Sequence, residues 1–321
     1  MRTQTVRQDV LLNAVHMAGR APSIHNTQPW RFRVAKDRVD LYADRSRRLH
    51  ATDVDGRDLL LSCGAALHHL RLALADNGHV TVRRFPNPDN PDHLATVQVK
   101  TGASCAGNPA LFAAITKRRT DRRPFTEWPV PQAFVRQLIN GASDQGAVLR
   151  SVSDPGAAKV LQAVAAAAAA AQERVPGYHA ELAQWTRTEG TAGIPRSSLL
   201  LDDDKVQVAG DRRFPPGDLA SGEPGQHDGA ILMVLGTASD DRLSQLRAGE
   251  ALSAVLLQAT QHGLASCAVS QALENRATRR AIQETVLDGT LCPQIVLRLG
   301  WAPANAPVPP TPRRPLAVIL I

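Results

Sequence analysis

A short segment near the N-terminus, PSIHNTQPW over residues 22–30, holds polar side chains between two prolines. The prolines restrict the backbone, and Ser23, Asn26 and Gln28 supply hydrogen-bond donors and acceptors. A rigid loop of this kind suits a ligand with a polar edge, because a few well-placed polar groups fix a ligand in its pocket. His25 could approach the same ligand or form a hydrogen bond that shapes the loop. We therefore predict a ligand-binding loop here.

A second segment, RRTDRRPF over residues 118–125, carries four arginines. The planar guanidinium group suits phosphate, because its fork of donors matches the geometry of that anion. Most other arginines stand in short clusters spread along the chain, as expected of solvated surfaces. Two more polar stretches, SCAVSQAL over 266–273 and PPTPRRP over 309–315, lie near the C-terminus.

The first two segments resemble motifs of nitroreductase-type flavoproteins. Residues 22–30 match P-S-x-x-N-x-Q-P-W at every fixed position. Residues 118–125 are similar to R-R-S-x-R-x-F, with Thr120 for serine and one extra residue before Phe125. The resemblance implies that FMN is bound by Pro22, Ser23, Ile24, His25, Asn26, Gln28, Arg118, Arg119, Thr120 and Arg122. In the family the first arginine and the hydroxyl bind the phosphate and ribityl chain, and the later basic residue reaches the flavin N1/O2 edge.

The C-terminal segments extend the resemblance. Residues 266–273 stand where the family has a strand-end loop whose backbone meets flavin N5, which implies contacts from Ser270 and Gln271. The family's acidic residue and glycine are absent there, so hydride transfer has less support than flavin binding. Residues 309–315 resemble the family's terminal K/P-x-R-x-P, with Arg313 as a phosphate partner. The chain most closely resembles the Acg-type nitroreductase-like proteins of mycobacteria, which are single-chain pseudo-dimers.

An internal repeat sets the architecture in which these segments would meet. LSCGAALHHLRLALADNG from Leu61 aligns without a gap with LRAGEALSAVLLQATQHG from Leu246. Both have apolar residues at helical spacing and a final glycine where a helix would end. Gly64 and Gly249 would let the two helices cross closely at a seam between two halves. The alternative is that any two helices rich in leucine and alanine look alike.

The coarse pattern of elements favours an α+β fold, because helices and short strands are mixed rather than strictly alternating. We expect two tandem nitroreductase-like halves, residues 1–104 and 105–321, forming a pseudo-dimer within one chain. Helices are expected over 6–20, from 57, over 111–119, from 131 and over 163–171, and strands over 31–36, 39–44, 79–85, 94–100, 230–236, 265–270 and 293–300. The irregular stretch 187–229 is predicted to be a lid.

Composition excludes several other classes. The 321 residues, 43% of them hydrophobic, can bury a large core. The net charge of +7 would be consistent with a nucleic-acid-binding protein. The arginines are scattered, however, and only 4% of residues are aromatic, too few for base stacking. The four cysteines form no C-x-x-C pair, so a zinc site is not expected. No segment resembles a signal peptide or membrane helix, which predicts a cytoplasmic protein.

The motifs predict one FMN per monomeric chain. The first half keeps P-S-x-x-N but has no R-R-S-x-R, whereas the second keeps the arginines but reads NGASDQGAV where its own P-S-x-x-N should stand. Two functions remain open: an NAD(P)H-dependent oxidoreductase acting on a small electrophile such as a nitro compound or quinone, and an FMN storage protein with little turnover. The sequence names neither the substrate nor the electron donor.

Overall fold

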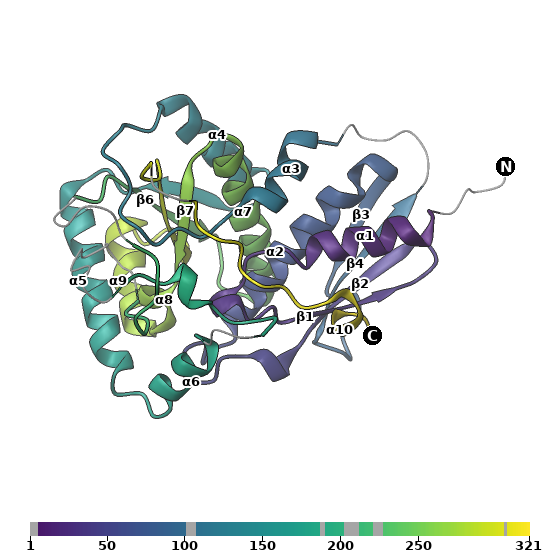
Figure 1. The fold of residues 1–321 in the computed structure, drawn as a ribbon, viewed down its shortest axis with the longest axis horizontal. Coiled ribbons are helices and arrows are strands. Elements are labelled where there is room, and N and C mark those ends of the chain that lie inside the picture. Colours follow the sequence, from purple (N-terminus) through teal and green to yellow (C-terminus); the bar gives the residue numbers. More distant parts are fainter. Residues whose placement is uncertain (1–5, 101–106, 187–189, 202–211, 221–226, 305–306) are drawn as a thin grey trace.

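The computed structural model describes residues 6–100, 107–186, 190–201, 212–220, 227–304 and 307–321. Two sheets flank a pair of long central helices (Figure 1). The first half comprises α1 (Gln8–Ala18), β1 (Trp30–Val34), β2 (Arg38–Ala43), α2 (Arg57–Leu74), β3 (His79–Arg84) and β4 (His93–Lys100). The second comprises α3 (Pro109–Lys117), α4 (Gln132–Ser143), β5 (Val148–Ser151), α5 (Pro155–Gln172), α6 (Tyr178–Trp185), β6 (Ile231–Thr237), α7 (Arg242–Gln261), β7 (Ala265–Val269), α8 (Gln271–Glu274), α9 (Arg276–Val286), β8 (Cys292–Gly300) and α10 (Leu316–Ile319).

The two sheets have the same topology. Their strand orders are β1-β2-β4-β3 and β5-β6-β8-β7, and every pairing is antiparallel. Each sheet has a shift of register at the matching place, between Leu41 and Tyr42 in β2 and between Leu235 and Gly236 in β6. Two unrelated sheets would not be expected to share an irregularity. The expected pseudo-dimer of tandem halves within an α+β fold is confirmed.

Helices α2 and α7 form the seam between the halves. Almost every residue of α2 is buried, as expected of a helix enclosed by protein on all sides. A Cβ atom on Gly64 would overlap the carbonyl oxygen of Leu246, and one on Gly249 would overlap that of Leu61. His68 Nδ1 lies 2.9 Å from Ser253 Oγ, a pair separated by the repeat offset of 185 residues. The predicted close crossing of the repeat helices is therefore confirmed.

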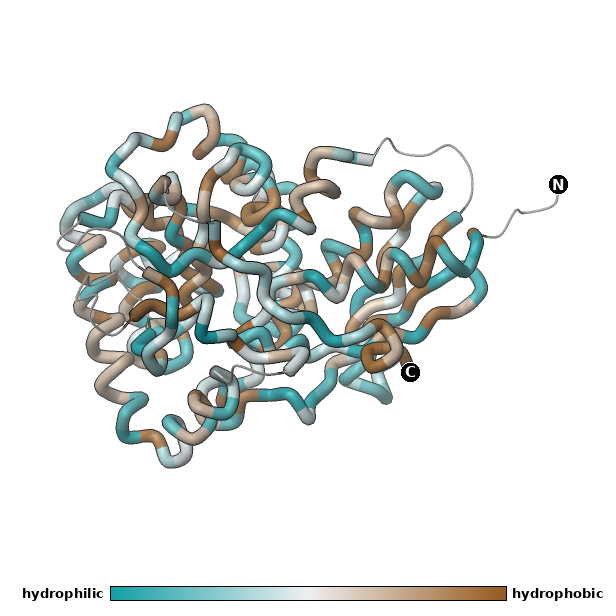
Figure 2. Tube along the Cα trace, in the orientation of Figure 1, coloured by the Kyte–Doolittle hydropathy of each residue, from teal (hydrophilic) through white to brown (hydrophobic). Residues whose placement is uncertain are grey.

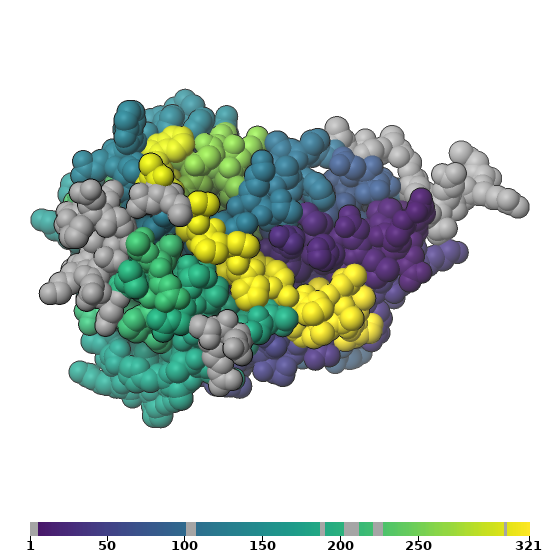
Figure 3. All heavy atoms as spheres, in the orientation of Figure 1, coloured from purple at the N-terminus to yellow at the C-terminus, as the bar shows by residue number. Residues whose placement is uncertain are grey.

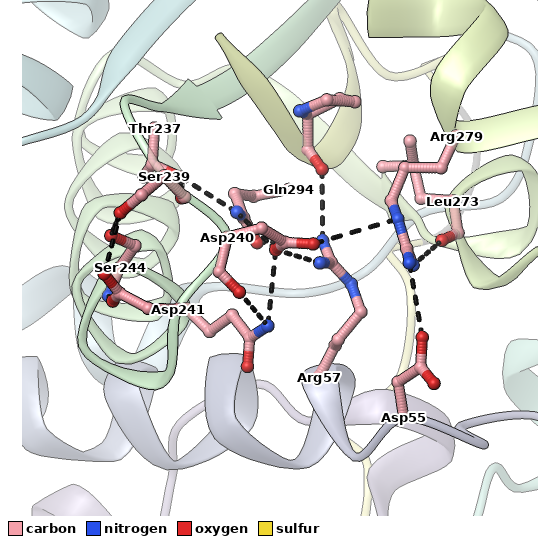
Figure 4. A network of polar contacts seen from close by, with 12 residues as sticks. Asp55, Arg57, Thr237, Ser239, Asp240, Asp241, Ser244, Leu273, Arg279 and Gln294 are labelled. Carbon is pink, nitrogen blue, oxygen red and sulfur yellow. Dashed lines mark hydrogen bonds and ion pairs between the residues drawn. The ribbon is translucent and has the colours of Figure 1, made fainter. Parts of the chain in front are cut away.

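A polar network also joins the halves (Figure 4). Arg57, at the start of α2, forms an ion pair with Asp240 and donates to Gln294 Oε1 at 2.9 Å and to the Pro293 carbonyl at 3.1 Å. Gln294 Nε2 in turn donates to Asp240 Oδ1 at 3.1 Å. The Arg57 guanidinium is thus fully engaged with groups of the second half.

The C-terminal segment crosses from the second half to the first (Figures 1 and 3). Leu320 bridges Phe32 in β1, and Ile321 N donates to the Phe32 carbonyl at 2.9 Å. Arg314 donates to the Gln28 carbonyl at 2.9 Å. Part of the proposed second half therefore packs on the first sheet. The division at residues 104 and 105 lies outside the described residues and stays a prediction.

Apolar residues gather inside each half (Figure 2). One core packs α1 and α2 against the first sheet, around Trp30 and Phe32. Another packs α4 and α7 against the second, around Leu138 and Leu235. Cys63 is a buried free thiol in the first of these cores, and Cys267 is buried in a further core formed with α5 and α9, whereas Cys105 lies outside the described residues. Of the helices in the described part of the chain, none combines the length and hydrophobicity of a membrane-spanning segment.

The predicted helices and strands are confirmed, and the structure adds β5, α6, α8, α9 and α10. Of the predicted lid, residues 187–189, 202–211 and 221–226 lie outside the described residues. Its described parts are tied to each other and to the body of the protein, since Leu200 bridges Leu219 within the stretch and Gly193 N donates to the Asn26 carbonyl at 3.2 Å. Whether this stretch acts as a lid stays a prediction.

Candidate functional site

A cavity of about 830 Å³, including the part open to solvent, lies at the junction of the two halves. The first half lines it mainly with polar groups: Pro22, Ser23, Ile24, His25, Asp58 and Ser62. The second half adds Thr120, Arg122, Arg212, Phe214, Ser270 and Gln271. Apolar residues of α2 and α7, among them Leu61 and Leu256, close the inner wall. Segments far apart in the sequence thus meet at one pocket, as the motifs predicted.

The loop that carries the first motif has a strained backbone. His25, Asn26 and Gln28 all have positive φ angles, 43°, 53° and 52°. For residues other than glycine, this conformation raises the free energy of the folded chain by roughly 1–2 kcal/mol each. The Ser23 hydroxyl accepts a hydrogen bond from Gln28 N at 2.9 Å, which helps to offset that cost. Strain held in place by neighbouring bonds is common at ligand sites.

The side-chain amides of Asn26 and Gln28 form hydrogen bonds within the protein. Asn26 Nδ2 donates to the carbonyls of Gly193 and Pro312 at 2.9 and 3.0 Å. Gln28 Nε2 donates to the Thr191 carbonyl at 2.8 Å, and Gln28 Oε1 accepts from Arg314 N at 2.8 Å. Neither side chain lines the cavity. Contact of Asn26 or Gln28 with a cofactor stays a prediction; in the structure they hold two distant segments against the loop.

Two arginines near the loop, Arg118 and Arg313, have no counter-ion among the described residues. Arg118 is buried and Arg313 is partly buried, neither lines the cavity, and the Nε atom of each is buried without a described hydrogen-bond partner. Burial and Arg119 lower the pKa of Arg118 to about 10. Burial, followed by Arg118, Arg20 and Arg119, lowers the pKa of Arg313 to about 9. Among the described residues no carboxylate pairs with either arginine, so this cluster is suited to an anion.

The other predicted arginines have different environments. Arg119 is more exposed, donates to the carbonyls of Thr116 and Arg118 at 2.8 and 2.9 Å, and does not line the cavity. Arg122 does line it, donates to the Ser198 carbonyl at 3.1 Å, and has its guanidinium 5.0 Å from the centre of the Phe214 ring. Within this motif, Arg122 therefore lines the cavity, whereas Arg118 belongs to the pair of arginines without a described counter-ion.

Ser270 and Gln271 reach the cavity from the start of a short helix. The prediction of a strand-end loop is refined here, since β7 ends at Val269 and α8 begins at Gln271. Ser270 Oγ donates to Glu274 Oε1 at 2.7 Å, and Gln271 Nε2 donates to Gln172 Oε1 at 2.8 Å. Both side chains are thus partly engaged within the protein.

Comparison with known proteins identifies the family. The model of the nitroreductase family matches residues 115–297. The chain is 42% identical to Rv3131 of Mycobacterium tuberculosis (strain H37Rv), provisionally named an NAD(P)H nitroreductase, over 100% of this chain and 93% of that protein. This protein belongs to the nitroreductase family. It is 39% identical to Acg of the same organism, also provisionally named an NAD(P)H nitroreductase, over 97% of this chain and 95% of that protein. The Acg-type resemblance is confirmed.

Among solved structures, this nitroreductase-family chain is similar to the FMN-dependent nitroreductase NfnB from Mycobacterium smegmatis, a complex with NADPH. The identity is 16% and the TM-score 0.42, over 65% of this chain and 96% of that chain.

Several cavity residues of this nitroreductase-family protein were not found from the sequence. Arg212 forms a buried ion pair with Glu274 and donates to the Tyr178 hydroxyl at 2.8 Å. Arg212 and Phe214 belong to an irregular stretch without periodicity, and Asp58 resembled an ordinary acidic residue in the first turn of a helix. No motif marked these positions, so only the tertiary arrangement shows that they line the cavity.

His25 lies in the cavity wall as a neutral ring. Burial lowers its pKa well below 6.5, and Arg212 and Arg122 lower it further. Its Nδ1 atom is buried without a hydrogen-bond partner, and the ring meets the edge of Phe214 at 5.4 Å between centroids. His25 was expected either to approach a ligand or to form a hydrogen bond that shapes the loop. The described residues supply no hydrogen bond to its Nδ1 atom, so this atom is available to a ligand.

Proposed function

We propose that this protein binds FMN in the cavity between its halves and acts as an NAD(P)H-dependent oxidoreductase on small electrophiles. The observation that carries the proposal is the pair of arginines with buried Nε atoms, Arg118 and Arg313, without a described carboxylate partner. Two desolvated cations held close together are costly unless an anion joins them. The dianionic phosphate of FMN would supply that anion.

The cavity residues also fit the rest of the cofactor. The cavity is lined by both halves and is partly open to solvent, so a cofactor could enter it. Ser23, Thr120 and Ser270 present hydroxyl groups suited to a polyol chain or ring edge, and His25 Nδ1 lacks a partner. Arg122 would provide a cation in the cavity, as the family resemblance implies. When bound, FMN would supply hydride transfer, while the chain binds it, orients it and excludes water.

The name NAD(P)H nitroreductase, provisionally given to relatives of 39–42% identity, supports a nicotinamide donor. A second function, FMN storage with little turnover, is favoured by one observation: Ser270, Gln271 and Ala272 replace the acidic–glycine pair of the family's N5 loop. Rapid mixing with excess NADPH and NADH separates the two. Bleaching of the flavin band with turnover of a nitroaromatic would support the oxidoreductase, and an unreduced flavin would support storage.

The phosphate assignment can be tested by substitution. We expect the purified chain to be yellow, and Arg118→Ala and Arg313→Ala each to weaken FMN binding about ten- to a hundred-fold. Each removes a charge-assisted contact worth roughly 1.5–3 kcal/mol. Arg280→Ala is the control, since Arg280 is exposed on α9 and paired with Glu284. Equal FMN retention in all three variants would disprove the placement of the phosphate.

We also propose that the chain is a monomer with one FMN, because the seam already joins the two halves that a nitroreductase dimer would supply. FMN released by denaturation, measured with the mass from light scattering, tests both points. A ratio near two, or an obligate dimer with FMN between chains, would contradict this arrangement.

A further inference from the structure

Asp58 is a buried carboxyl group that lines the cavity and has no partner for its carboxyl oxygens among the described residues. It stands in the first turn of α2, lines the cavity, and is 8% exposed. The described residues offer its carboxyl oxygens no hydrogen bond and no ion pair, although burying an unpaired carboxylate is costly. The proposed binding of FMN assigns no role to this side chain.

The charged groups around Asp58 have other partners. Asp53 caps α2, since its two carboxylate oxygens accept from Asp58 N at 3.1 Å and Leu59 N at 2.9 Å. The helix N-terminus is therefore used by Asp53. Glu274 pairs with Arg212. Arg57 binds Asp240 and Gln294 (Figure 4).

This environment favours a neutral Asp58. Burial raises the pKa of Asp58 well above its usual range, and the charges of Asp53 and Glu274 raise it further. Arg57 and Arg212 act in the opposite direction but more weakly. Burial also raises the pKa of Asp53, to about 6, but the backbone N–H groups of Leu59 and Asp58 lower it, so Asp53 loses its proton before Asp58 does. Two neighbouring carboxyl groups in different environments commonly divide into one anion and one acid.

We propose that Asp58 is a neutral carboxylic acid that donates a proton to the electrophile during its reduction, an inference that rests on the proposed oxidoreductase function. Reduction of a quinone to a hydroquinone takes up two electrons and two protons. A hydride that originates from NAD(P)H brings both electrons and one proton. The second proton leaves the Asp58 carboxyl oxygen as a new O–H bond forms on the quinone, and solvent then reprotonates the Asp58 carboxylate.

The protonation state can be measured without cofactor or turnover. In protein labelled with ¹³C at the aspartate carboxyl carbon, the signal missing from Asp58→Asn identifies Asp58. We expect this carboxyl group to be protonated at pH 7 in the full chain. An Asp58 signal that titrates near pH 4, like an ordinary aspartate, would overturn the proposal whether or not FMN binds.

The catalytic role is tested on the FMN-loaded protein in separate half-reactions. In Asp58→Asn we expect flavin reduction by NAD(P)H to change less than about threefold, and reoxidation by benzoquinone to slow by about a hundredfold, the usual size of a general-acid contribution. Asp58→Glu should recover part of the rate, and its pH profile should shift. Asp55→Asn is the matched control, because Asp55 pairs with Arg276 and Arg279.

Equal reoxidation rates in wild type and Asp58→Asn would overturn the proton donor. Failure of the wild-type chain to bind FMN, or to be reduced by NAD(P)H, would instead overturn the proposed function.

Discussion

The cavity has a pseudo-symmetric counterpart across the α2–α7 seam, and the two sites differ in what occupies them. The repeat offset relates Leu256 and Val269, which line the cavity, to Arg71 and Arg84 on the other side. Both arginines bind Glu250, which is fully buried; Arg84 does so through two bonds of 2.7 and 2.8 Å. Where one side leaves room for a ligand, the other contains an internal ion cluster.

The connecting loops differ as well. On the cavity side, residues 19–29 link α1 to β1 and include the strained loop that carries the first motif. At the matching place, residues 144–147 link α4 to β5, and Gln145 accepts a hydrogen bond from Arg71 at 2.8 Å. One backbone architecture thus supports a pocket on one side and a closed interface on the other. A few side chains and one loop decide which is formed.

The largest effect on stability is expected from removing Glu250, the centre of the ion cluster with Arg71 and Arg84. Glu250→Ala should lower the free energy of unfolding by about 3 kcal/mol, because Arg71 and Arg84 would lose their buried partner. FMN affinity and stoichiometry should stay unchanged, as measured by denaturant unfolding and flavin titration. Glu284→Ala, which breaks an exposed pair, should cost less than about 1 kcal/mol. A second FMN bound by Glu250→Ala would show that the cluster alone closes that side.

The seam itself should be the next most sensitive place. Gly64→Ala inserts a methyl group against the Leu246 backbone, so we expect a loss at the upper end of about 1–3 kcal/mol. In Gly141→Ala the atoms nearest to the new methyl group belong to the side chain of Gln258, which can move, so the loss of stability should be smaller. Thermal unfolding of both variants provides the measurement. Equal melting temperatures would argue against tight packing of the two halves.

Acid should destabilise the protein through histidines that belong to the first half. Burial lowers the pKa of His68 to about 3, and burial also lowers the pKa values of His25 and His69 well below 6.5. Below pH 6.5 these histidines bind protons in the unfolded chain but stay neutral in the folded one, so the free energy of unfolding falls as pH falls. Each histidine lowers it by about 1.4 kcal/mol per pH unit. His68→Gln should flatten this slope in unfolding measured from pH 7 to 5, whereas exposed His16→Gln should not.

The smallest effect concerns the hydrogen bond across the seam. Ser253→Ala removes the hydroxyl 2.9 Å from His68 Nδ1 and should cost about 1 kcal/mol. A double-mutant cycle with His68→Gln measures their coupling. Strictly additive effects would mean that the two residues do not interact across the seam.

Much of this arrangement could be predicted from the sequence because periodicity and motif order are local signals. The repeat helices, most strands and the meeting of the two motifs were predicted in this way. Asn26 and Gln28 show the limit: their types suit a ligand, yet their hydrogen bonds run to Gly193, Pro312 and Thr191. Likewise, neither the burial of Asp58 nor the pairing of Arg212 has a local signature. The cytoplasmic location and the choice between turnover and storage stay predictions.

The path of the C-terminal segment has a consequence for the order of synthesis. The ribosome makes residues 22–28 nearly a full chain length before residues 312–314, whose groups bind Asn26 and Gln28. The nascent N-terminal half can form its sheet, but its strained loop lacks these anchors until residues 312–314 have been made. Cofactor loading would then follow the synthesis of both halves. Chains that lose this segment to proteolysis or premature termination would keep both sheets and lose the pocket.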